Sequence, residues 1–145
     1  MNVHDLVKAG ADHLVTARPE DTIESAATLL STNNIGALPV RDIDARLVGV
    51  VSERDITRAV ARHGVKALSL RVADVMTRDV ITCGPDDSVK SVMETMTRRH
   101  IRHLPVVEKG ELVAMLSQRD LMQALVEQTA LELNVLRDYV HAKRS

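Results

Sequence analysis

Hydrophobic residues follow the same order twice along the chain. A short apolar stretch at Leu14–Thr16 comes first and recurs at Val80–Thr82, and apolar residues at helical spacing follow each one. Two β-branched stretches and a second helical pattern complete each half. This order predicts a strand, a helix, two strands joined by a hairpin, and a second helix in both halves. The apolar positions of the first helices are Ile23, Ala26, Ala27 and Leu30, and Val89, Val92, Met93 and Met96.

Turn and cap residues mark the boundaries of these elements. The second helices are predicted to begin at Ser52 and Ser117, and the first of them to end near His63–Gly64, where glycine suits the position after a helix. The hairpin turns differ in length, since Asp42–Arg46 corresponds to the shorter Glu108–Glu111. The other boundary residues are Pro19 and Pro85 in turns, and the N-cap candidates Asp21, Thr22, Asp87 and Ser88.

The two patterns are copies of one sequence unit. A unit of about 60 residues with two short helices is only marginally stable alone, so we expect the copies to pack around an approximate two-fold axis, with matching clefts between them. The predicted fold is mixed α/β (α+β), with two β-α-β-β-α repeats and a C-terminal helix. The recurring segments are Leu14–Ile23 with Val80–Val89, Ile35–Val40 with Ile101–Val106, and Leu47–Ile56 with Leu112–Leu121.

The duplication divides the chain into four segments. The first repeat spans residues 6–64 and the second spans 77–126, with a linker at 65–76 that contains a short predicted helix at Val72–Met76. The last helix runs on through Tyr139 into an extension, residues 127–145, that the first repeat lacks. This tail could cover the core, form a homodimer or dock a partner. The apolar residues on or near one face of the whole last helix are Leu121, Leu125, Leu133, Leu136 and Val140.

Composition narrows the partners of such a protein. The 145 residues include no Trp or Phe and one Tyr, and the formal net charge is -1. This charge gives no reason for non-specific nucleic-acid binding, and a chain so poor in aromatic rings cannot stack a series of bases. The single cysteine, Cys83, excludes an intramolecular disulfide and is predicted to be a packing residue. With no signal peptide or membrane span visible, a cytoplasmic protein is predicted.

A Ser-x-Arg-Asp motif stands at the start of the second helix in both repeats. Ser-x-x-Asp at a helix start is most simply a capping box, but capping does not explain why arginine recurs at the same inner position. A helix N-terminus with serine and arginine donors suits a phosphate, and an aspartate can span the vicinal hydroxyls of a ribose. Together these groups point to a nucleotide. The motif residues are Ser52, Arg54 and Asp55, and Ser117, Arg119 and Asp120.

A basic pair distinguishes the second repeat. Arg102 and His103 precede a predicted strand at the mouth of the cleft, whereas Gly36 and Ala37 occupy the corresponding positions of the first repeat. The two clefts are therefore electrostatically unequal, and we do not expect equal occupancy. The upstream residues Arg98, Arg99 and His100 are interpreted as a solvated helix end that complements the helix dipole.

These motifs resemble those of a tandem cystathionine-β-synthase (CBS) domain pair, often called a Bateman module. The resemblance covers roughly residues 6–126 and rests on Asp74-Val-Met-Thr77, the first-strand threonines, the Leu-Pro-Val segments and the Ser-x-Arg-Asp motifs. It implies a regulatory, signal-transduction module whose cleft holds an adenosine nucleotide: AMP, ADP or ATP, and in some members NAD or S-adenosylmethionine. It also implies a homodimer and an unidentified regulated protein.

The resemblance further implies roles for matching residues. Asp55 and Asp120 would hold ribose, Thr16 and Thr82 would read the adenine edge, and the Leu-Pro residues would wall the base. The motif serines and arginines and the basic pair would meet phosphates. Lys8–Ala11 lacks the Asp-Val-Met-Thr signature, so the site around Asp120 is expected to be the stronger. The predicted binding set is Thr16, Leu38, Pro39, Ser52, Arg54, Asp55, Thr82, Arg102, His103, Leu104, Pro105, Ser117, Arg119 and Asp120.

Two other classes of function remain open. A metal enzyme could use His100 and His103, but no obvious third ligand accompanies them, and no catalytic triad or phosphate-binding glycine loop is visible. We therefore predict no catalytic activity, no metal and no obligatory cofactor. The second alternative is a protein-interaction or dimerisation module with vestigial clefts. The remaining histidines are His4, His13, His63 and His141.

Overall fold

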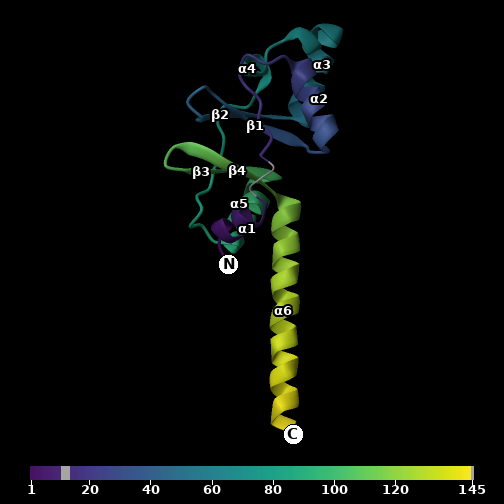
Figure 1. Cartoon of the computed structure of the whole chain (residues 1–145). Helices are drawn as coiled ribbons and strands as arrows, with labels where there is room; N and C mark the ends of the chain where they lie inside the picture. Colours follow the sequence, from purple (N-terminus) through teal and green to yellow (C-terminus); the bar gives the residue numbers. More distant parts are fainter. Residues whose placement is uncertain (11–13, 145) are drawn as a thin grey trace.

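The chain forms two similar halves followed by one long helix (Figure 1). The computed structural model describes residues 1–10 and 14–144, so Ala11 and His13 lie outside the described residues. The repeated order of helix, hairpin and helix confirms the mixed α/β fold. The elements are α1 (Val3–Gly10), α2 (Ile23–Asn33), β1 (Ala37–Arg41), β2 (Leu47–Ser52), α3 (Glu53–His63), the 3-10 helix η2 (Gly64–Ser69), α4 (Val72–Val75), α5 (Val89–Arg99), β3 (His103–Glu108), β4 (Glu111–Ser117) and α6 (Gln118–Arg144).

Each half contains one antiparallel hairpin, β1–β2 or β3–β4, and the predicted first strand is reduced to a single pairing residue. In the first half Ala17, just after Leu14–Thr16, pairs in parallel with Val40. Extending this pairing toward the N-terminus would need a hydrogen bond from the N–H of Pro39, which proline lacks. The expectation of full first strands is therefore wrong. The second half repeats the arrangement with Val80–Thr82, Cys83, Val106 and Pro105.

Side-chain caps fix the starts of the helices near the predicted positions. The hydroxyls of Thr22 and Ser88 accept hydrogen bonds from backbone N–H groups in the first turns of α2 and α5, at 3.1 and 3.0 Å. Helix α3 begins after the N-cap Ser52 and ends at His63, where Gly64 has a positive φ of 63°. Glycine adopts this backbone conformation without steric strain, which explains why the helix ends there.

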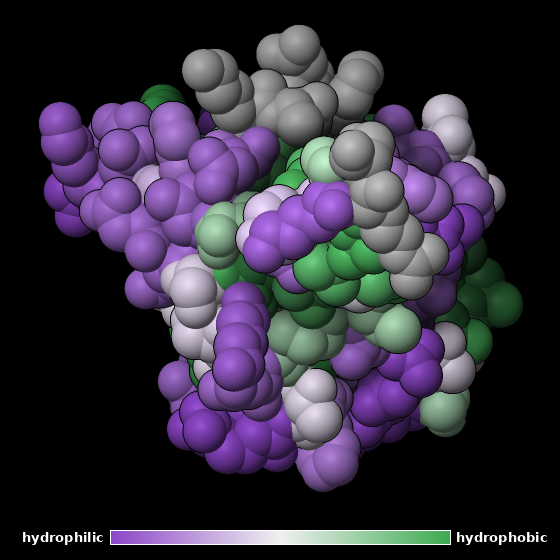
Figure 2. Space-filling view, turned by 90° about the horizontal axis from the view of Figure 1, so that it is seen from below, coloured by the Kyte–Doolittle hydropathy of each residue, from purple (hydrophilic) through white to green (hydrophobic). Residues whose placement is uncertain are grey.

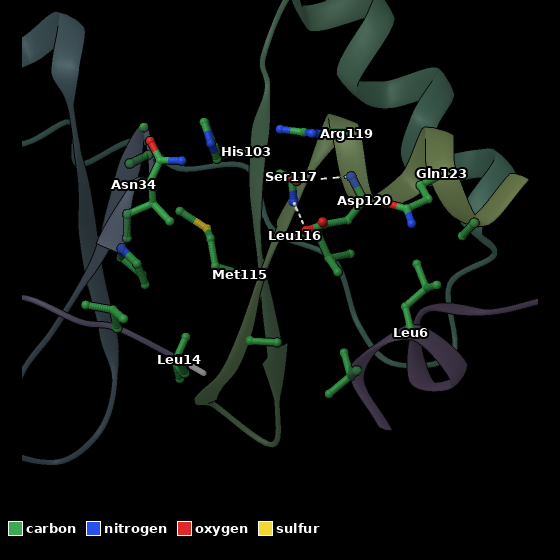
Figure 3. A pocket seen from close by; sticks show the side chains of 18 of the residues that line it. Leu6, Leu14, Asn34, His103, Met115, Leu116, Ser117, Arg119, Asp120 and Gln123 are labelled. Carbon is green, nitrogen blue, oxygen red and sulfur yellow. Dashed lines mark hydrogen bonds between the residues drawn. The ribbon is translucent and has the colours of Figure 1, made fainter. Parts of the chain in front are cut away.

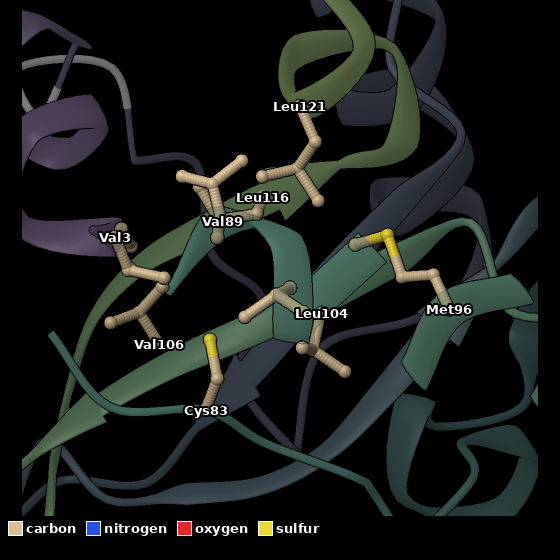
Figure 4. Close-up of a cluster of buried hydrophobic side chains, with 10 residues drawn as sticks. Val3, Cys83, Val89, Met96, Leu104, Val106, Leu116 and Leu121 are labelled. Carbon is tan, nitrogen blue, oxygen red and sulfur yellow. The ribbon is translucent and has the colours of Figure 1, made fainter. Parts of the chain in front are cut away.

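Each half has its own aliphatic core, and the segment that precedes each repeat packs on the other half. Val3 of α1 is fully buried in the core of the second half (Figure 4), and its N–H donates to the Asp87 carbonyl at 2.9 Å. Val72 of α4 is fully buried in the core of the first half, and its N–H donates to the Asp21 carbonyl at 2.7 Å. The two halves are therefore joined by exchanged segments as well as by their facing surfaces.

Helix α6 starts against the second half and then leaves the protein body (Figure 1). Leu121 is buried beside α5, whereas residues 129–143 are all exposed. The helix continues past the predicted Tyr139 to Arg144. Among the helices that the structure describes, none combines the length and the apolar character needed to cross a membrane.

Candidate functional site

A cavity lies between the two halves, at the N-terminal end of α6 (Figure 3). Its volume of about 880 Å³ falls within the range of small-molecule sites. Both halves contribute to its wall, so a ligand here would touch both repeats. The first half supplies Leu14, Val15, Asn34, Ile35, Gly36, Ala37 and Pro39, the second half supplies His103, Ala114, Met115, Leu116, Ser117, Arg119, Asp120, Gln123, Ala124 and Glu127, and α1 supplies Leu6 and Val7.

One side of this cavity is polar and the other is apolar. The polar side carries His103, Arg119 and Asp120, while Leu6 and Leu14 stand on the opposite side (Figure 3). The Asp120 N–H donates to the Ser117 hydroxyl at 3.1 Å, and the Ser117 N–H donates to an Asp120 carboxylate oxygen at 3.4 Å. This reciprocal cap holds the exposed carboxylate at the start of α6, where the Gln118 N–H also donates to the Arg102 carbonyl at 2.8 Å.

His103 connects the polar side of the cavity to the first half. A Cβ atom at position 36 would lie 3.2 Å from His103 Cε1 and 3.8 Å from a Glu53 carboxylate oxygen, so any side chain here would displace the imidazole by a few tenths of an ångström. Burial lowers the pKa of His103 below its usual value, and Arg102 adds to this effect, while Glu53 and Asp120 oppose it. The imidazole is therefore held closer to its neutral form by desolvation.

The corresponding motif of the first repeat is engaged within the chain. Both the N–H and the hydroxyl of Ser52 donate to Asp55 Oδ2, at 2.9 and 3.0 Å. The Thr77 hydroxyl donates to the other oxygen, Oδ1, at 3.4 Å, and Thr77 itself is held by two backbone hydrogen bonds with Val50. Thr77, the first residue of the second repeat, thus gives Asp55 a hydrogen-bond partner from the other half. The two helix starts therefore differ in their hydrogen bonding, while the unequal occupancy of the two clefts stays a prediction.

Five of the predicted binding residues meet in the cavity, and a sixth lies next to it. Arg102 lines an adjoining hollow of about 720 Å³ together with His103, Arg119 and Met122. Leu38 and Leu104 lie in the two cores instead. The five are Pro39, His103, Ser117, Arg119 and Asp120, while Thr16, Leu38, Ser52, Arg54, Asp55, Thr82, Leu104 and Pro105 line neither hollow.

Several residues of the cavity wall do not belong to the predicted binding set. Met115 precedes Ser117 by two positions on β4, so strand periodicity could have found it. Gln123 and Glu127 follow Asp120 at helical spacing, and the Gln123 amide donates to a Glu127 carboxylate oxygen at 3.3 Å. The contribution of α1 carries no such signal, because it depends on how a distant segment packs.

Two expectations about reactive groups concern Cys83 and metals. Cys83 is buried, and burial, with a smaller contribution from Asp87, raises the pKa of its thiol to about 12. The thiol is therefore protonated near neutral pH, as expected of a packing residue. Within residues 1–10 and 14–144, no group of three His, Cys, Asp or Glu side chains is placed to hold a metal ion.

Comparison with known proteins identifies the family. The family model described as CBS domain matches the chain twice, at residues 4–62 and 72–127. The chain belongs to the CBS-domain family. This confirms the predicted resemblance and the tandem arrangement of two CBS domains.

Solved structures of CBS-domain proteins share this fold. The CBS-domain containing protein ATU1752 from Agrobacterium tumefaciens matches with a TM-score of 0.78 and 36% sequence identity, over 85% of this chain and 92% of that one. The CBS domain pair of protein MJ0100, solved in complex with 5′-methylthioadenosine and S-adenosyl-L-methionine, matches with a TM-score of 0.76 and 28% identity, over 88% of this chain and 98% of that one. The fold of a CBS-domain pair is thereby confirmed.

A curated relative is the mitochondrial CBS domain-containing protein CBSX3 of Arabidopsis thaliana. It is 33% identical over 125 residues, which are 83% of this chain and 61% of the relative. The chain thus spans about three fifths of the length of CBSX3. The cellular compartment of the present protein stays a prediction.

Proposed function

We propose that this CBS-domain pair is a regulatory module that binds an adenosine nucleotide in the cavity at the Asp120 end. The observation that carries the proposal is the division of one inter-repeat cavity into a polar side at a helix start and an apolar side. A nucleotide has the same division, because its phosphates and ribose are polar and its base has two apolar faces. The solved structure of the MJ0100 CBS domain pair supports this ligand class, because that pair is in complex with two adenosine compounds.

The wall residues suit separate parts of such a ligand. Arg119 and His103, with Arg102 at the adjoining hollow, would meet phosphates near the positive end of the α6 dipole. Asp120 would accept hydrogen bonds from the ribose hydroxyls. The base would lie toward Leu14 on the apolar side. AMP, ADP, ATP and NAD all carry these groups, and the end around Asp55 would bind more weakly.

Binding in this place would act on both repeats at once. A ligand that contacts the first half and the start of α6 would favour one relative arrangement of the halves, and a partner protein could read that arrangement. We propose that the module acts in this way as a homodimer, without catalytic activity of its own. The alternative is an interaction module with vestigial clefts, which is favoured by the exposed apolar side chains of α6.

Calorimetric titration of the full chain with AMP, ADP, ATP and NAD tests the proposal. We expect saturable binding below millimolar concentration and at least tenfold weaker binding by the Asp120→Ala variant, since a hydrogen bond to a charged group contributes about 1.5–3 kcal/mol. Asp55→Ala is the matched control, because Asp55 closes the same kind of helix cap. If no nucleotide binds at millimolar concentration, or if the two variants weaken binding equally, the proposed site is wrong.

A further inference from the structure

Helix α6 carries a row of exposed apolar side chains that the protein body does not cover. The helix projects from the body (Figure 1), and hydrophobic residues also reach the surface on the face seen from its C-terminal end (Figure 2). Leu133 and Leu136, near the middle of the projecting part, are 51% and 58% exposed. The exposed members of the row are Met122, Val126, Leu133, Leu136 and Val140.

The spacing of this row is that of a coiled-coil seam. From Met122 to Val140 the positions advance by four and three residues in turn, which keeps them on one face over about three heptads. Leu121 and Leu125, which pack on the core of the second half, lie to one side of this row. The seam is therefore separate from the surface that attaches α6 to its own chain. The seam residues are Val126, Leu133 and Val140 at a positions and Met122, Thr129 and Leu136 at d positions.

We propose that α6 pairs with α6 of a second copy of this chain in a parallel, two-stranded coiled coil. Valine at two of the three a positions, with leucine at a d position, favours two parallel strands. The proposal rests on the homodimer of the proposed function and specifies its interface. It does not require a bound nucleotide.

Charges beside the seam select the parallel orientation. Glu132 occupies a g position and Arg137 occupies the e position of the following heptad. In a parallel pair each g residue faces the next e residue of the other helix, so Glu132 of each copy would face Arg137 of the other. In an antiparallel pair g faces g and e faces e, and neither combination brings these opposite charges together.

The seam begins next to the ligand cavity. Met122 and Val126 line the hollow that adjoins Arg102 and His103, and Gln123 lines the main cavity. A ligand at the start of α6 would therefore contact the same helical turns that pair with the second copy. Through the paired α6 helices, a ligand bound in the cavity of one protomer would therefore affect a helix that contacts the other protomer.

Sedimentation equilibrium of the full chain tests the interface. We expect a dimer at micromolar concentration, and a dissociation constant at least tenfold higher for Leu133→Glu, which would place two carboxylates opposite each other at the seam. Leu131→Glu is the matched control, because Leu131 is 65% exposed on the opposite side of the same helix, and it should change the constant less than twofold. A monomeric parent chain, or equal effects of the two substitutions, would overturn the proposal.

Cysteine cross-linking tests the orientation. Thr129→Cys and Leu136→Cys stand one heptad apart, at d positions about 10 Å from each other along the helix. Each should form a disulfide with its own equivalent in a parallel pair, whereas an antiparallel pair opposes at most one of them to itself. Failure of either to cross-link faster than Leu131→Cys would overturn the parallel arrangement. Native Cys83 is buried and does not interfere.

Nucleotide titration of the Leu133→Glu variant separates the two proposals. Leu133 lines neither hollow, so its substitution should leave nucleotide affinity within about twofold if binding occurs within one chain. If Leu133→Glu dissociates the dimer but the parent chain binds no nucleotide, the proposed function alone is wrong. If the parent chain binds nucleotide and the Leu133→Glu variant is still a dimer, the coiled coil alone is wrong.

Discussion

His103 shows how one residue can couple ligand binding to pH. Desolvation lowers its pKa in the ligand-free protein, and a phosphate beside it would favour the protonated imidazolium and raise that pKa. Binding would then take up a proton, so affinity for AMP should be highest below the raised pKa and fall as pH increases through it. Each unit of pKa difference corresponds to a factor of about ten in affinity. A calorimetric series between pH 6 and pH 8 measures this trend.

The phosphate of AMP also titrates in this range, and the His103→Gln variant serves as the control. A phosphate gains negative charge with rising pH, so its own titration should strengthen binding and oppose the effect of the histidine. The difference between parent and variant isolates His103. If both show the same pH dependence, the imidazole does not meet the phosphate.

At the residue scale, the sequence predicted the chemistry of the site better than its contacts. The Ser-x-Arg-Asp motif placed Ser117 and Asp120 at a helix start, because capping depends on neighbours in the chain. The bond from Thr77 to Asp55 and the approach of His103 to Gly36 join residues far apart in sequence. Such contacts follow from packing of the two halves, and no local pattern reveals them.

At the scale of elements, the linker between the repeats packs closely against β2 at Gly49. A Cβ atom at Gly49 would lie 2.7 Å from Met76 Sδ and 2.8 Å from the Thr77 carbonyl oxygen, so a side chain here would push the linker away. We expect Gly49→Ala to lower the free energy of unfolding by about 1–3 kcal/mol, as overpacking does. Urea unfolding followed by circular dichroism measures the change.

Gly84→Ala is the matched control for this steric effect. Its Cβ atom would meet only the Val107 carbonyl oxygen, at an ordinary 3.9 Å, so stability should stay the same or rise by a few tenths of a kcal/mol. A Gly49→Ala variant as stable as the parent would show that the linker moves freely on β2. The helices could be predicted from the periodicity of apolar residues. The length of the first strands could not, because it depends on the N–H that the prolines of β1 and β3 lack.

At the scale of the whole molecule, each half is completed by a helix from outside it. Helix α1, which precedes the first repeat, packs on the second half, and α4, which precedes the second repeat, packs on the first half. Sequence similarity marks the repeats but not this exchange, because it does not show which half each helix packs against. In the structure α1 and α4 donate backbone hydrogen bonds to Asp87 and Asp21, which occupy corresponding positions of the two recurring segments. Val3 and Val72 are equally and fully buried, one in each core. Truncating either side chain removes apolar contacts from the half that its helix completes, at a cost of about 1–3 kcal/mol.

We expect Val3→Ala and Val72→Ala each to lower the midpoint of one shared unfolding transition. Because the segment that precedes each repeat is buried in the other half, unfolding of one half removes the packing of a segment that is joined to the other, and the halves cannot unfold independently. Differential scanning calorimetry measures this directly, since the calorimetric and van't Hoff enthalpies agree for one transition. Two separated transitions, with only one moved by each substitution, would mean that the exchanged helices detach without disturbing the half they come from. The cavity between the halves could then open by local unfolding rather than by a rotation of two joined repeats.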